Sequence, residues 1–303
     1  MHPDGQPTDA SWQAERARQV LAAFDRLAPD ILLIELFPFG RRLIEFELLP
    51  LIERAVARTP RPLLACSIRD VLAFKPDPAK RQRMVDRARR WFDVVLFHGD
   101  SALLPLARSL PEADALADRI VETGYVRNQG SRRTVEPTPT GEIVVSAGGG
   151  AVGTPLIEAA LAAREISRER DRPWRILVAG TGILPRIEPG LVVEPNRPDF
   201  SALLASAHLS VSQAGYNTVV DLLESRVRAL LVPFAVHAET EQSLRAEALA
   251  QRGIAAMLAE SELSPARLAA AIDAAAARPR PDHHVRLDGA ASSAAALLDR
   301  VGA

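Results

Sequence analysis

The fold is decided by residues 143–155, which read IVVSAGGGAVGTP. An apolar, β-branched run leads into three glycines, and Pro155 stands where a helix accepts proline as its first residue. A strand that turns sharply into a helix is the building unit of a parallel α/β sheet. The turn also presents backbone N–H groups and the positive end of a helix dipole, which together attract anions such as a diphosphate.

Two familiar nucleotide motifs fit this turn incompletely. A P-loop requires Lys where Thr154 stands. Gly148, Gly150 and Gly153 have the spacing of the dinucleotide pattern GxGxxG, but the next apolar run, residues 176–179, ends in Gly180 instead of an acidic residue that would hold a ribose. The pattern therefore gives little support to a nicotinamide cofactor. A tight turn that binds no ligand also stays open.

Apolar runs of strand length alternate with longer segments of helical spacing. The runs lie at residues 31–36, 63–68, 93–98, 120–122, 143–147, 176–179, 191–193, 209–212 and 229–232. Continuous β-rich runs are typical of strands buried on both faces of a parallel sheet. Residues 129–141 interrupt the rhythm with prolines and glycines and predict a linker. We therefore predict an α/β chain with lobes at residues 1–128 and 142–280, and a terminal helix in 281–303 that packs back on the body.

The composition favours a small-molecule ligand. The 303 residues suffice for two lobes, and 37 Lys and Arg nearly balance 38 Asp and Glu, so nothing indicates nucleic-acid binding. Cys66 is the only cysteine, which excludes an intrachain disulfide and a cysteine-built zinc site. No apolar run approaches the roughly 18–20 residues of a transmembrane helix, and residues 1–9 do not resemble a signal peptide. We expect a cytoplasmic protein, with peripheral contact to the inner face of the membrane left open.

A second strand-to-helix junction lies at residues 209–221, LSVSQAGYNTVVD. Its helix begins after Gly215 with Asn217 and Thr218 in the first turn, at the carboxyl end of a strand, where open α/β sheets usually bind ligands. Asp221 lies about one helical turn after Asn217, so its carboxylate is placed to accept hydrogen bonds from ribose hydroxyls. Ordinary capping by Asn217 or Thr218 is the alternative.

A third junction lies at residues 232–242, VPFAVHAETEQ, beside the same sheet edge. Glu241 and Gln242 open its helix and can hydrogen-bond sugar hydroxyls, although a helix start favours acidic residues through the dipole alone. Two anion-binding helix starts in one lobe favour a single diphosphate ligand that is held from two sides.

In this order, the glycine turn, residues 212–221 and residues 232–242 resemble the donor lobe of glycosyltransferase family 28, within a group of predicted bacterial glycosyltransferases. The resemblance covers residues 143–257 best. It implies the GT-B fold, with two Rossmann-like lobes, and hexosyl transfer from a nucleoside-diphosphate sugar, expected to be a UDP-sugar, to a hydroxyl acceptor. No cofactor or metal is required by such a scheme, because helix N-termini and backbone amides stabilise the departing diphosphate.

The resemblance also assigns site residues. Asp221 matches the acidic residue that binds the ribose, although the family usually has Glu there. Backbone near Arg197 matches the contact with the base, and Glu241 and Gln242 match the pair that reads the donor sugar. The segments that match those holding the diphosphate contain Gly148, Gly149, Gly150, Gly215, Tyr216, Asn217 and Thr218.

Family members open with a further strand and a glycine- and histidine-containing loop before anything like residues 12–36. The resemblance therefore implies that the first lobe is incomplete and lacks the loop that typically supplies the acceptor-side base. His98 ends the run at residues 93–98 on the sheet edge where a substrate would lie. That placement alone suggests His98 as the base that deprotonates the acceptor.

Two alternatives remain open. A sugar-nucleotide 2-epimerase has the same two-lobed fold but requires further carboxylates and histidines. A non-catalytic nucleotide-sugar-binding subunit, working with a partner chain or as a homodimer, is favoured only by the missing front of the first lobe.

Overall fold

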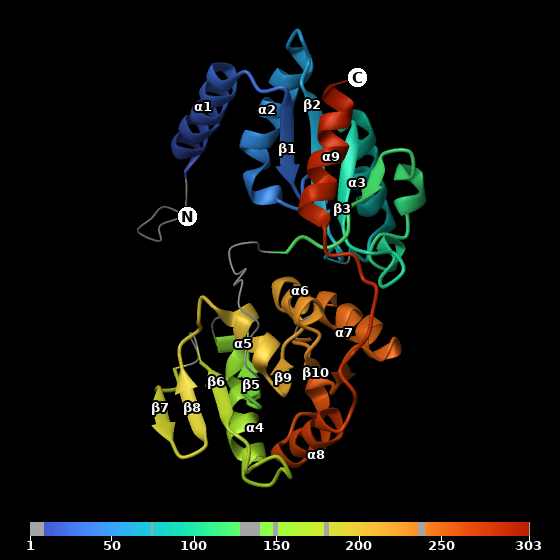
Figure 1. Ribbon diagram of the computed structural model, residues 1–303. Helices are drawn as coiled ribbons and strands as arrows, with labels where there is room; N and C mark the ends of the chain where they lie inside the picture. Colours follow the sequence, from blue (N-terminus) through green and yellow to red (C-terminus); the bar gives the residue numbers. More distant parts are fainter. Residues whose placement is uncertain are drawn as a thin grey trace. The chain divides into compact units, whose positions relative to one another are not determined.

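The computed structural model describes residues 9–73, 75–127, 140–147, 151–178, 182–235 and 240–302. The chain divides into two compact units (Figure 1). The first consists of Met1–Gly99, Leu106–Gly124 and Gly289–Ala303, and the second of Asp100–Pro105 and Tyr125–Asp288. Each unit is an α/β structure around a largely parallel sheet, so the predicted fold class is confirmed. Most of the predicted linker, residues 129–139, lies outside the described residues.

The first unit is built on a parallel sheet in the order β1-β2-β3-β4. Its strands are β1 (Ile31–Glu35), β2 (Leu63–Arg69), β3 (Val94–His98) and β4 (Ile120–Glu122). Its helices are α1 (Ala10–Leu27), α2 (Glu45–Ala57), α3 (Pro78–Trp91) and α9 (Gly289–Val301), with 3-10 turns η1 (Arg42–Ile44), η2 (Leu106–Arg108) and η3 (Ala113–Leu116).

Helices cover both faces of this sheet. Ile68 of β2 and Phe97 of β3 pack in one core cluster with Ile52 of α2. On the other face, Ala65 of β2 packs with Leu297 of α9, the last helix of the chain (Figure 1). Burial on both faces explains why these strands are continuous apolar runs in the sequence.

The second unit has a sheet in the order β11-β10-β9-β5-β6-β8-β7, parallel except for the antiparallel pair β7 and β8. Its strands are β5 (Ile143–Ser146), β6 (Trp174–Leu177), β7 (Arg186–Glu188), β8 (Leu191–Glu194), β9 (Leu209–Ser212), β10 (Arg228–Leu231) and β11 (Ala256–Met257). Its helical segments are η5 (Ala151–Gly153), α4 (Thr154–Arg164), α5 (Phe200–Ser206), α6 (Tyr216–Ser225), α7 (Glu241–Gln251), η6 (Glu260–Glu262) and α8 (Pro265–Ala276).

Helices also cover both faces of the second sheet. Ile157 of α4 and Ile272 of α8 pack against Val145 of β5 in one core cluster. Val219 of α6 and Leu249 of α7 line a small apolar space together with Ala229 of β10. The second unit is therefore also an α/β layer with helices on both faces of its sheet.

The order of the second sheet reverses next to β5. Strands β6 and β8 extend the sheet on one side of β5, whereas β9, β10 and β11 lie on the other. Ser146 at the end of β5 is in register with Ser212 at the end of β9. In open α/β sheets the crevice at the carboxyl ends of the strands beside such a reversal is the usual ligand position.

Candidate functional site

A pocket of about 370 Å³ lies in the second unit, where the start of α6 meets the start of α5. Three separate segments build it: residues just before the predicted linker, the connection from β8 into α5, and one face of α6. Its lining residues are Val126, Arg127, Pro198, Phe200, Ser201, Asn217, Val220 and Asp221. The volume falls in the roughly 300–1,000 Å³ range of small-molecule sites.

Asp221 is the acidic group of this pocket. Its Oδ1 accepts a hydrogen bond from the Ser201 hydroxyl of α5, and Oδ2 takes no part in that bond. Burial raises the pKa of the Asp221 carboxyl, the Ser201 hydrogen bond lowers it, and the nearby Glu224 carboxylate raises it. Asn217 lies one turn before Asp221 on α6 and is exposed on the pocket wall. The structure therefore brings these two predicted residues together.

Arg127 supplies a positive charge to the same pocket. Its guanidinium forms an ion pair with Glu224 of α6 at 2.8 Å, about one turn after Asp221. Both side chains of this pair are about 30% exposed, so the pair adds little stability and mainly fixes where the guanidinium lies. Sequence reasoning missed Arg127, Ser201 and Phe200, because these residues lie far along the chain from Asp221 and outside any junction pattern.

Gly215 forms the start of α6. It is the N-cap residue and has no side chain with which to cap the first amides. Among the described residues, a Cβ built at Gly215 would meet only the Thr218 hydroxyl oxygen, at 4.0 Å. Ser212 at the end of β9 is 1% exposed, and its hydroxyl has no hydrogen-bond partner among the described residues. A helix start of this kind is suited to binding an anion.

Tyr216 is buried and is not among the residues that line the pocket. Its ring is 8% exposed and packs against Tyr125 with ring centroids 5.6 Å apart. Its hydroxyl accepts a hydrogen bond from the Val126 backbone N–H at 3.0 Å. The Tyr216 side chain thus holds the segment that carries Arg127, while its backbone belongs to the first turn of α6.

Gln242 joins the ends of two neighbouring strands. Its Oε1 accepts hydrogen bonds from the backbone N–H of Ala214, after β9, at 3.0 Å and of Phe234, after β10, at 3.1 Å. The Nε2 group takes no part in these two bonds. Glu241 is the first residue of α7 and is half-buried. Both predicted sugar-reading residues therefore lie at the carboxyl edge of the sheet.

Arg197 uses its side chain within its own loop. The guanidinium forms two 2.8 Å hydrogen bonds with Asp199 and a third with Glu194 at 3.3 Å, which raises the Arg197 pKa. Arg175 also pairs with Glu194, at the same oxygen, Oε1. This network fixes the loop that carries Pro198 into the pocket; the contact of the backbone near Arg197 with a base stays a prediction.

The predicted glycine turn at Gly148, Gly149 and Gly150 lies outside the described residues. The structure resumes at η5, and Pro155 lies in the first turn of α4, as the sequence indicates. The Nε2 group of Gln213 donates to the Val152 carbonyl at 3.1 Å, which ties the end of β9 to the segment before α4.

His98 ends β3 in the first unit and is half-buried. Its Nδ1 lies 2.9 Å from the Thr123 hydroxyl, which donates to the carbonyls of Phe97 and Gly124 at 3.1 and 3.0 Å. Because the hydroxyl proton is used in this way, Thr123 accepts from Nδ1–H, and the lone pair of the neutral imidazole lies on Nε2. Burial and the charge of Arg69 lower the pKa of His98, and Glu35 opposes them.

No group of three or more His, Cys, Asp or Glu among the described residues is arranged to hold a metal ion. No helix in the described part of the chain has the length and apolar character needed to cross a membrane.

Part of the chain is similar to a known protein family. The model of the glycosyltransferase family 28 C-terminal domain matches residues 191–295. The UDP-N-acetylglucosamine--N-acetylmuramyl-(pentapeptide) pyrophosphoryl-undecaprenol N-acetylglucosamine transferase of Rhizobium leguminosarum bv. trifolii is 32% identical over 152 residues, 49% of this chain and 40% of that protein. The protein of the same name from Rhizobium etli is 27% identical over 237 residues, 70% of this chain and 63% of that protein. The chain thus spans less than two thirds of the length of these relatives.

Solved structures show the fold. MurG from Acinetobacter baumannii matches with a TM-score of 0.58 at 17% identity, over 97% of this chain and 82% of that one. Spinosyn rhamnosyltransferase SpnG in complex with thymidine diphosphate matches with a TM-score of 0.59 at 14% identity, over 97% of this chain and 75% of that one. The predicted pair of Rossmann-like lobes is confirmed. The chain therefore has the GT-B fold, and its residues 191–295 are similar to the glycosyltransferase family 28 C-terminal domain.

Proposed function

We propose that this chain is a glycosyltransferase that moves a sugar from a UDP donor to a hydroxyl acceptor. The observation that carries the proposal is the pocket that joins Asp221, Asn217 and Arg127 beside the start of α6. This pocket lies at the carboxyl edge of the sheet, next to the reversal of strand order. The relatives that match the chain are named as UDP-N-acetylglucosamine transferases, which supports uridine as the base.

In this proposal the nucleoside occupies the 370 Å³ pocket. Oδ2 of Asp221 accepts hydrogen bonds from the ribose hydroxyls, and Ser201 holds the carboxylate in position through Oδ1. The base lies toward Phe200 and the backbone beside Arg197, a loop fixed by its own ion pairs. Arg127, held by Glu224, provides positive charge at the pocket wall.

The diphosphate then lies at the start of α6, with amides from Gly215 to Thr218 on one side and the glycine turn at Gly148 to Gly150 on the other. Negative charge grows on the diphosphate as the bond to the sugar breaks. Backbone amides and the helix dipole stabilise that charge most strongly in the transition state, so they accelerate the reaction without a metal ion. Glu241 and Gln242 bind the hydroxyls of the sugar.

His98 is proposed as the base that takes the proton of the acceptor hydroxyl. The hydrogen bond from Nδ1 to Thr123 favours the tautomer that offers the Nε2 lone pair. The lowered pKa of His98 keeps the imidazole neutral, and therefore able to accept a proton, at neutral pH. On this proposal the first unit serves the acceptor and the second unit the donor, in a cytoplasmic enzyme.

Calorimetric titration with UDP tests the proposal. We expect the wild-type chain to bind UDP, and Asp221→Asn to weaken binding about 10- to 100-fold, because hydrogen bonds to a charged group contribute about 1.5–3 kcal/mol. Asp282→Asn is the matched control, since Asp282 is a largely exposed acid of the same unit that pairs only with Arg226 among the described residues. A folded chain that binds no UDP would refute the proposal. Conversion of a bound UDP-sugar to its 2-epimer, without transfer, would refute the reaction type.

A further inference from the structure

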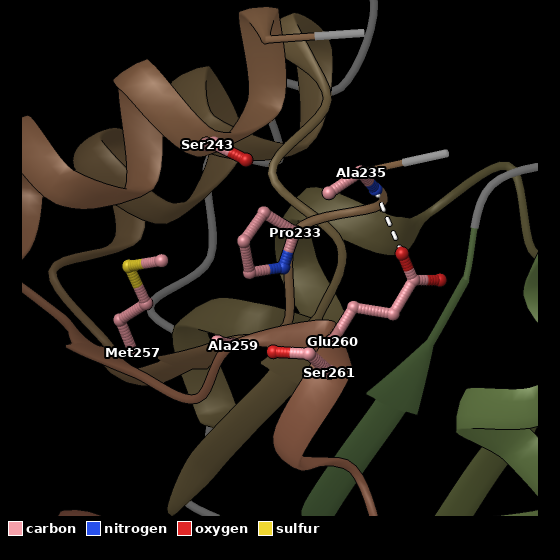
Figure 2. Close-up of a pocket in the computed structure, with 7 residues that line it drawn as sticks. All are labelled: Pro233, Ala235, Ser243, Met257, Ala259, Glu260 and Ser261. Carbon is pink, nitrogen blue, oxygen red and sulfur yellow. Dashed lines mark hydrogen bonds between the residues drawn. The ribbon is translucent and has the colours of Figure 1, made fainter. Parts of the chain in front are cut away.

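A second pocket, of about 280 Å³, lies at the carboxyl ends of β10 and β11 (Figure 2). Three segments line it: the residues after β10, the first turn of α7, and the passage from β11 into η6. Its lining residues are Pro233, Ala235, Ser243, Met257, Ala259, Glu260 and Ser261. It is smaller than the roughly 300–1,000 Å³ of a drug-sized ligand site, so a group of about the size of a sugar ring or its substituents suits it.

Its position continues the proposed path of the donor. The helix start that would hold the diphosphate follows β9, and Gln242 joins the end of β9 to the end of β10 through Ala214 and Phe234. Ser243, the next residue, lines the second pocket, as do the two neighbours of Phe234. Adjacent strands lie about 4.8 Å apart, so the pocket begins roughly one strand spacing beyond the end of β9, and a sugar joined to a diphosphate held at the start of α6 would reach it.

The lining combines one carboxylate with hydroxyl and apolar groups. Oε2 of Glu260 accepts a hydrogen bond from the Ala235 backbone N–H at 2.8 Å, which fixes the carboxylate at the pocket wall and leaves Oε1 to accept another donor (Figure 2). The hydroxyl-bearing residue Ser243 lies on the opposite side of Pro233 in the same view. Met257, Pro233 and Ala259 provide the apolar part.

We infer that this second pocket binds the substituents of the donor sugar ring and selects uncharged sugars that carry O–H or N–H donors, such as hexoses and N-acylated hexosamines. Hydroxyl and acylamino groups donate to Glu260, and an acyl methyl group packs against Met257 and Pro233. A uronic acid would place its carboxylate against Glu260 and is rejected by charge repulsion. The inference rests on the proposed function, because it names the sugar-recognition part of the donor site.

The test is calorimetric titration of the full chain with UDP, UDP-glucose, UDP-N-acetylglucosamine and UDP-glucuronic acid. Glu260→Gln keeps an oxygen for the Ala235 amide but removes the charge. We expect it to leave UDP affinity unchanged, to weaken UDP-N-acetylglucosamine about tenfold, and to strengthen UDP-glucuronic acid. Ser243→Leu fills the pocket from the opposite wall and is expected to reduce the affinity for either neutral UDP-sugar to that for UDP.

Glu262→Gln is the matched control, because Glu262 lies in the same 3-10 turn but pairs with Arg267 outside the pocket. If Glu260→Gln and Ser243→Leu both bind every UDP-sugar as the wild type does, the inference is overturned while UDP binding still supports the proposed function. If the folded wild-type chain binds neither UDP nor any UDP-sugar, the proposed function fails and the inference fails with it.

Discussion

Two substitutions of Gln242 separate its effect on the stability of the second unit from its effect on binding of the donor sugar. In Gln242→Ala, the backbone N–H groups of Ala214 and Phe234 lose their shared acceptor. Ala214 is fully buried, so water cannot readily replace the lost bond there. A buried unsatisfied amide costs about 1–3 kcal/mol, so we expect a loss of about 2–4 kcal/mol in the free energy of unfolding of the second unit. For a domain of this size that corresponds to a fall of about 4–16 °C in its melting temperature.

Gln242→Glu is the informative partner of that variant. A carboxylate oxygen still accepts from both amides, so thermal unfolding is expected close to that of the wild type. The Nε2 donor is lost, however, so the affinity for UDP-N-acetylglucosamine should fall in both variants while that for UDP falls in neither folded protein. Melting followed by circular dichroism, with calorimetric titration below the transition, gives both quantities. The stabilising role of the Gln242 oxygen is refuted if Gln242→Ala has the melting temperature of the wild type, or if Gln242→Glu is destabilised as much as Gln242→Ala.

Two further predictions concern histidines. His98→Gln should slow transfer by about 10²–10⁴-fold with UDP affinity unchanged. Because the pKa of His98 is lowered, the wild-type transfer rate should persist as the pH falls to about 6.5 and decline only below it. A decline that begins above about pH 6.5 would contradict the role of His98 as the base. His283 is buried, its Nε2 donates to the Leu223 carbonyl at 3.0 Å, and burial lowers the pKa of its imidazole. Below about pH 6.5 the His283 side chain therefore binds more protons in the unfolded chain than in the folded one, so the free energy of unfolding falls. His283→Gln should lessen this acid loss in urea unfolding measured at about pH 7.5 and about pH 5.5, with His208 accounting for part of the remainder; an unchanged loss would refute its role.

Most strands of the parallel sheets could be predicted from the sequence because burial on both faces requires continuous apolar runs. Two strands were missed. β7 consists of exposed residues with two charges among three, and its pairing depends on the hairpin turn into β8. β11 has only two residues, which is too short for any pattern. Helical spacing continues in the sequence from Pro155 to about residue 170, but α4 ends at Arg164, because Asp273 of α8 accepts from Ser167 and Arg168 and holds a turn there.

The candidate site was predictable where a strand-to-helix junction carries it. Asn217 and Asp221 have helical spacing after a glycine, so the sequence alone predicts that they share one face, and the structure has both in one pocket. Arg127 and Ser201 reach the pocket only through long-range packing, including the Tyr216 contact with Val126, and no local pattern records that. The glycine turn lies outside the described residues, so its role stays a prediction.

Hydrogen exchange with mass spectrometry of the full chain locates bound UDP, and so tests most directly whether UDP binds at the start of α6. We expect UDP to slow exchange of the backbone amides at residues 215–221 and 126–127, with no change in α2 or α3 of the first unit. Protection confined to the first unit, or no protection at residues 215–221 under saturating UDP, would contradict binding of UDP at the start of α6.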